Sequence, residues 1–79
     1  MLEQDIINLG FTKEYGENES FYYYTLDVGS KETPLTLISP ANDEIADEGW
    51  WYVEIFNYGD IKFKERDHLR DFIHIINNR

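Results

Sequence analysis

The chain has 79 residues, of which 42% are hydrophobic and 16% aromatic, and its formal net charge at pH 7 is −9. This length predicts one domain, residues 1–79, with a small core, and the apolar content is too high for a disordered chain. The negative charge argues against direct binding of nucleic acid or of an anionic membrane surface, because both need Lys and Arg to meet phosphate groups.

The sequence contains no cysteine, which excludes disulfides and thiolate metal sites and favours a reducing, cytoplasmic location. The first ten residues lack the basic start of a signal peptide, and no apolar run approaches the ~20 residues of a membrane span. Residues 1–60 hold thirteen acidic residues against Lys13 and Lys31, a net charge of −11, whereas residues 61–79 carry +2. The acidic part indicates either ordinary solubility or a face that meets a basic partner.

The first predicted element is a short helix over residues 2–9. Its apolar residues recur at helical spacing and form one stripe, Leu2, Ile6 and Leu9. Gly10 is placed to end the helix in the left-handed conformation, with Phe11 folding back onto Ile6. A strand over residues 11–15 and a polar turn over residues 16–19 follow.

A strong strand is predicted over residues 20–28, because its residue types and its period of two suit a half-buried sheet. The face assigned to the core carries Tyr22, Tyr24, Leu26 and Val28. Phe21 and Tyr23 therefore belong to the other face. A loop over residues 29–34 leads to a short strand over residues 35–39.

Residues 41–49 form a long acidic connection, which has room for a helical turn and is long enough to be functional or mobile. Its carboxylates make the only dense acidic cluster of the chain, Asp43, Glu44, Asp47 and Glu48. Such oxygens can bind Ca²⁺ or Mg²⁺, but the spacing lacks the alternation and the central glycine of an EF-hand loop. We therefore predict a solvated acidic loop and no metal site.

The stretch over residues 49–59 is rich in aromatic and β-branched residues, and it predicts a strand over residues 50–56. A tight turn over residues 57–60 and a brief returning strand over residues 61–63 follow. The side of the strand assigned to the core carries Trp51, Val53 and Ile55. Trp50, Tyr52 and Phe56 are left on the opposite side.

The last predicted element is a helix that begins near Glu65 and ends near Asn77-Asn78. Its apolar stripe is Leu69, Phe72, Ile73 and Ile76. Strands joined by short polar turns predict antiparallel pairing, and a helix with one apolar stripe packs on a sheet. The predicted fold class is therefore α+β, an antiparallel sheet of three to five strands with the N-terminal and C-terminal helices on one face.

This arrangement leaves the second face of the sheet uncovered. The large side chains predicted on it are Phe21, Tyr23, Ile38, Trp50, Tyr52 and Phe56. A patch of this size is typical of an interface. Alternatively, these residues stabilise the sheet through cross-strand pairs, or the connection over residues 41–49 covers them.

No catalytic or cofactor signature is present. Ser20, Ser30 and Ser39 lie in turns or at strand ends, outside any nucleophile elbow, and the five glycines are isolated, so no phosphate-binding loop exists. His68 and His74 point about 120° apart on their helix and cannot share a metal. We therefore predict no enzyme activity, no catalytic residue and no cofactor.

The order of these motifs resembles that of small bacterial and prophage-type proteins with an α-β-β-β-α pattern. The residues that carry the resemblance span nearly the whole chain: Leu9-Gly10-Phe11, Tyr22-Tyr23-Tyr24-Thr25-Leu26, Leu35-Thr36-Leu37-Ile38-Ser39, Trp51-Tyr52-Val53-Glu54-Ile55-Phe56, Phe63 and Leu69 to Ile73. These motifs are structural, so the resemblance implies a fold and no functional site.

The sequence predicts a small interaction module that binds a protein partner, or a second copy of itself, through the aromatic sheet face. Its predicted contact residues are Phe21, Tyr23, Trp50, Tyr52 and Phe56, edged by Asp43, Glu44, Asp47 and Glu48. The alternative is an acidic inhibitor or DNA mimic of a mobile element, in which these carboxylates form a line with the spacing of phosphates. A metal-binding or small-ligand protein is the third possibility.

Overall fold

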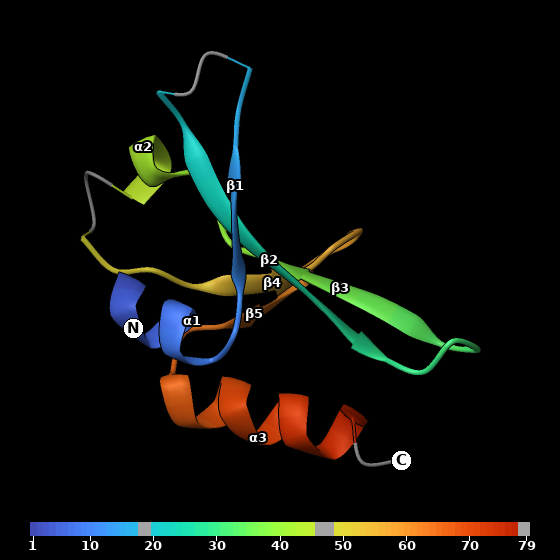
Figure 1. The fold of residues 1–79 in the computed structure, drawn as a ribbon. Helices are drawn as coiled ribbons and strands as arrows, with labels where there is room; N and C mark the ends of the chain where they lie inside the picture. The colour runs from blue at the N-terminus through green and yellow to red at the C-terminus, as the bar shows by residue number, and fades with distance from the viewer. Residues whose placement is uncertain (18–19, 46–48, 78–79) are drawn as a thin grey trace.

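The computed structural model describes residues 1–17, 20–45 and 49–77. In chain order the elements are α1 (Glu3–Asn8), β1 (Thr12–Tyr15), β2 (Tyr22–Gly29), β3 (Pro34–Ile38), α2 (Asn42–Ile45), β4 (Val53–Ile55), β5 (Tyr58–Phe63) and α3 (Arg66–Asn77). The strands form one antiparallel sheet in the order β1-β2-β3-β4-β5, and α1 and α3 pack on the same face of it (Figure 1). The predicted α+β fold class is therefore confirmed.

Helix α1 ends as the sequence predicts. Gly10 has a φ of 96°, and its N–H donates to the carbonyl of Ile7 at 3.1 Å. The N–H of Phe11 donates to the carbonyl of Ile6 at 3.4 Å. This pair of bonds closes the helix with a left-handed residue and turns the buried Phe11 ring toward the core.

The register of the strands gathers the apolar side chains on the face that the helices cover. Leu26 lies opposite Leu37, Leu37 lies opposite Ile55, and Val53 lies opposite Phe63. The buried core consists of Ile6, Phe11, Tyr24, Val28, Leu37, Ile45, Trp51, Val53, Ile55 and Leu69. Both helices and the central strands therefore contribute to one core.

The acidic connection holds the predicted helical turn as α2. Ile45 is buried, and the side-chain oxygen of Asn42 accepts a hydrogen bond from the Tyr22 N–H at 2.8 Å. Asp43 and Glu44 are exposed between these two contacts. Asn42 thus bonds the start of α2 to the start of β2, and Ile45 belongs to the core.

The predicted strand over residues 50–56 is wrong in its extent. Only Val53–Ile55 form β4, and Phe56 and Asn57 make the turn, where Asn57 has a φ of 72°. Residues 58–60, predicted as part of the turn, belong to β5.

Two features end β4 early. Its ladder with β3 pairs Ile38 with Glu54. Two residues after Ile38, beyond the end of β3, stands Pro40, which has no N–H to donate. The backbone of Trp51 is paired with Met1 instead: the Trp51 N–H donates to the Met1 carbonyl at 2.8 Å, and the Met1 nitrogen donates to the Trp51 carbonyl at 3.0 Å. Trp50, Trp51 and Tyr52 therefore lie outside the strand.

The predicted aromatic sheet face is consequently not continuous. Tyr23 and Ile38 do lie on the uncovered face. Tyr23 and Thr25 are alternate residues of β2 and therefore share a face, and Thr25 is paired with Ile38. Glu14 opposite Tyr23 and Glu54 opposite Ile38 make this face mixed in polarity. Phe56 lies in the turn at the tip of the β4–β5 hairpin.

Tyr24 links β2 to α1 through its hydroxyl, which donates to the Glu3 carboxylate. Burial raises the pKa of the Tyr24 phenol above its usual range, and the bond to Glu3 adds to the shift. Because the folded state holds this proton more tightly, its contribution to stability is complete below about pH 10, the ordinary tyrosine value, and is lost as the pH rises further.

We expect Tyr24→Phe to lower the free energy of unfolding by about 1–2 kcal/mol at neutral pH, because one hydrogen bond to a carboxylate is lost. Urea unfolding at increasing pH above about 10 should show stability falling less steeply in Tyr24→Phe than in the wild type. Tyr58→Phe, which removes the hydroxyl of an exposed tyrosine, is the matched control. Equal alkaline slopes for Tyr24→Phe and the wild type would contradict this assignment.

Candidate functional site

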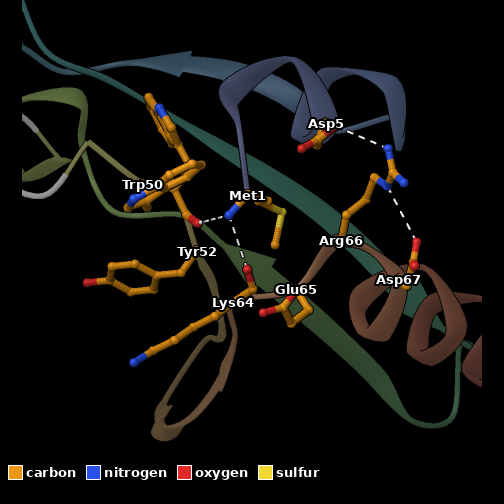
Figure 2. Close-up of a pocket in the computed structure, with 9 residues that line it drawn as sticks. Met1, Asp5, Trp50, Tyr52, Lys64, Glu65, Arg66 and Asp67 are labelled. Atoms are coloured by element: carbon orange, nitrogen blue, oxygen red, sulfur yellow. Dashed lines mark hydrogen bonds and ion pairs between the residues drawn. The ribbon is translucent and has the colours of Figure 1, made fainter.

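A surface hollow of about 590 Å³ lies where the start of the chain, the segment before β4 and the junction of β5 with α3 meet. We call it the Trp50 hollow. It is lined by Met1, Asp5, Trp50, Trp51, Tyr52, Lys64, Glu65, Arg66 and Asp67 (Figure 2). Its size falls within the range of natural ligand pockets, which is roughly 300–1,000 Å³.

The two adjacent tryptophans have opposite roles. Trp51 is 7% exposed, and its ring lies 5.5 Å from the Tyr24 ring and 6.2 Å from the Tyr22 ring, measured between centroids. Trp50 is 62% exposed beside the hollow. The aromatic surface of Trp51 therefore stabilises the fold, whereas most of that of Trp50 remains available to a ligand.

Tyr52 stands beside Trp50 and is half-buried. The ammonium group of Lys62 lies 5.2 Å from the centre of the Tyr52 ring and 3.8 Å from the Glu54 carboxylate. A cation over a ring and an ion pair on the same side chain restrict where Lys62 and Tyr52 can lie. The position of Tyr52 in the hollow is thus restricted by Lys62, which belongs to the β4–β5 hairpin.

Met1 lies in the middle of the hollow (Figure 2). Its nitrogen donates to two carbonyls, those of Trp51 at 3.0 Å and Lys64 at 3.1 Å. These bonds join the segment before β4 to the end of β5. The backbone that carries Trp50 is therefore held in place on one side.

The side of the hollow opposite the aromatic rings is ionic (Figure 2). The Arg66 guanidinium lies 3.7 Å from the Asp5 carboxylate and 3.4 Å from the Asp67 carboxylate, so it bridges α1 and the first turn of α3. Asp5 also accepts a hydrogen bond from the Leu2 N–H at 2.9 Å. Arg66 and Asp5 thus form a polar wall attached to both helices.

Among the predicted contact residues that the structure describes, Trp50 and Tyr52 are the two that line the hollow. Phe21 precedes β2 and is 39% exposed, and Phe56 is 53% exposed at the hairpin tip. Asp43 is exposed on α2, as is Glu44. Asp47 and Glu48 lie outside the described residues, so the spacing of the predicted line of carboxylates stays a prediction.

Sequence reasoning missed the rest of the hollow. It gave no binding role to Met1, Asp5, Lys64, Glu65, Arg66 or Asp67. No local signal connects them to Trp50, because Met1 and Asp5 lie more than forty residues before it and the residues from Lys64 to Asp67 lie 14 to 17 residues after it.

Two of the serines considered in the sequence analysis, Ser39 and Ser30, have structural contacts. The buried Ser39 hydroxyl accepts from the Tyr24 N–H at 2.9 Å and donates to the Pro40 carbonyl at 3.0 Å. The Ser30 hydroxyl is hydrogen-bonded to Thr33.

Within residues 1–17, 20–45 and 49–77, no three His, Asp or Glu side chains are grouped closely enough to hold a metal ion. In the same residues, no helix has the length and apolar character of a membrane span.

The arrangement is suited to binding. The Trp50 hollow combines an exposed indole, a partly ordered phenol and a fixed ion pair, and these three residue types, Trp, Tyr and Arg, dominate the energetics of protein interfaces. Compared with known proteins, the chain matches no protein-family model, no curated protein and no solved structure.

Proposed function

We propose that this chain is a non-catalytic interaction module that binds a basic protein partner in the reducing cytoplasm, with Trp50 as the anchor of the contact. The observation that carries the proposal is the 62% exposure of Trp50 at the rim of a hollow whose base is held by hydrogen bonds and an ion pair. An anchor on an ordered base loses little entropy on binding, which favours affinity.

The charge of the chain favours a basic partner. The net charge is −9, whereas the charges that line the hollow balance: Asp5, Glu65 and Asp67 are offset by Lys64, Arg66 and the Met1 ammonium. The preference for a basic partner therefore comes from the chain around the hollow. Asp43 and Glu44 on α2 add exposed carboxylates at the start of the connection that leads to Trp50. Complementary charge increases the association rate and disfavours acidic competitors.

The test is affinity capture from extracts of the cells that make the protein, with proteins identified by mass spectrometry. The wild type, Trp50→Ala and Ile75→Ala are compared; Ile75 is 68% exposed on α3, outside the lining of the hollow, and is the matched control for loss of an exposed apolar side chain. The supporting result is a basic protein captured by the wild type and by Ile75→Ala but not by Trp50→Ala.

With that partner purified, Trp50→Ala should raise the dissociation constant by about thirtyfold or more, which is the loss of affinity typical of a hot-spot tryptophan. Capture of the same proteins at the same level by Trp50→Ala would contradict the proposal. If the partner is a DNA-binding protein and duplex DNA displaces the chain from it, the acidic-inhibitor alternative is favoured over a general interaction module.

A further inference from the structure

The Met1 nitrogen links two backbone segments beyond the last pair of the β4–β5 ladder, Val53 with Phe63. It donates to the Trp51 carbonyl at 3.0 Å and to the Lys64 carbonyl at 3.1 Å. The Met1 carbonyl in turn accepts from the Trp51 N–H at 2.8 Å. One residue therefore joins the segment that carries Trp50 to the end of β5.

Both bonds from this nitrogen require an amine. An ammonium group has three N–H donors, so it gives one to each carbonyl and keeps a third. An acylated nitrogen is a planar amide with a single N–H, which serves only one of the two carbonyls with good geometry. Whichever carbonyl keeps that donor, the connection through Met1 between the Trp51 segment and β5 is broken.

Acylation also changes the charge of the Trp50 hollow. Met1 lies in the middle of the hollow, between the aromatic rings and the ionic wall (Figure 2). With its ammonium, three positive groups face the three acidic side chains of the lining. Loss of that one charge leaves the lining with a net charge of −1, so an acyl group alters both the backbone and the electrostatics of the hollow.

We propose that the α-amino nitrogen of Met1 is a modification site, at which acylation releases the segment carrying Trp50 from the end of β5. An acyl thioester is the class of donor that this chemistry needs. The ammonium first loses a proton to solvent, and the amine attacks the thioester carbonyl carbon. The N–C bond forms, the C–S bond breaks, and the leaving thiolate takes the second proton from nitrogen. This inference does not rest on the proposed partner, because it concerns the backbone beneath Trp50.

The test uses four versions of the full 79-residue chain made by chemical synthesis. Met1 carries a free amine, an Nα-acetyl group, an Nα-methyl group or one added glycine. The methylated nitrogen keeps its charge and two N–H donors, whereas the added glycine makes an amide and keeps a positive charge one residue away. Hydrogen exchange measured by NMR compares the Trp51 N–H with the Phe56 N–H, which donates to the Thr36 carbonyl at 2.8 Å and is the matched control.

We expect the ratio of the Trp51 to the Phe56 exchange rate to rise about fivefold or more in the acetylated and glycine-extended chains. The methylated chain should stay within about twofold of the free chain. Far-UV circular dichroism establishes that each version is folded, and the glycine-extended chain carries the comparison if acetylation prevents folding.

Equal ratios in the acetylated and free chains would overturn the proposal. A methylated chain that exchanges as fast as the acetylated one would also overturn it, because bulk and not the number of donors would then decide. A glycine-extended chain that matches the free chain is equally contrary, since charge alone would then account for the effect of acetylation.

Discussion

Trp51→Ala is expected to lower the free energy of unfolding by about 3–5 kcal/mol, the usual cost of deleting a buried tryptophan side chain. Trp51 is 7% exposed and packs against the rings of Tyr22 and Tyr24. A domain of this size has a net stability of only about 3–5 kcal/mol from its core. The variant should therefore be largely unfolded at room temperature.

The neighbouring Trp50 provides the control for this prediction. Trp50→Ala removes the same number of atoms from a side chain that is 62% exposed, and we expect a change within about 0.5 kcal/mol. Urea unfolding followed by far-UV circular dichroism compares the two variants without depending on tryptophan fluorescence. Similar losses for both would contradict the division of roles between the two tryptophans.

Gly29→Ala is expected to lower the free energy of unfolding by about 2–4 kcal/mol, because two penalties combine there. Gly29 has a φ of 90°, and a β-carbon on it would lie 2.4 Å from the backbone oxygen of Thr33. The obstacle is backbone at the turn between β2 and β3, where the Ser30 hydroxyl accepts a hydrogen bond from the Thr33 N–H at 3.2 Å. It cannot move aside as a flexible side chain would.

Gly10→Ala separates the two penalties. Gly10 has a similar φ of 96°, but a β-carbon there would meet no atom within 4 Å. We expect Gly10→Ala to cost only about 1–2 kcal/mol, the strain of the left-handed backbone alone. Thermal and urea unfolding of both variants give the difference. Equal losses would show that the contact with Thr33 is relieved at little cost.

The local features of the fold were predictable because each depends on neighbouring residues. The stripe of Leu69, Phe72, Ile73 and Ile76 places α3 correctly, and Gly10 ends α1 where a left-handed residue is needed. The alternation along β2 identifies Tyr24 and Val28 as core residues, and both are buried. In each case the periodicity of the backbone determines which side chains share a face.

The extent of β4 was not predictable by the same reasoning. Trp50 to Phe56 have strand-forming side chains, but a strand exists only where a partner offers its backbone. Pro40, just beyond the end of β3, has no N–H to donate, and Met1 pairs with the backbone groups of Trp51. Side-chain propensity carries no information about either event, since both depend on which segments meet in space.

The fold class, the helix ends and the core positions, Trp51 among them, were predictable from the sequence, because they follow from spacing and residue type. The meeting of Trp50 with Asp5 and Arg66 in one hollow, by contrast, was visible only in the structure. The physical reason is that this hollow is made by long-range backbone pairing and an interhelical ion pair, whose partners lie far apart along the chain.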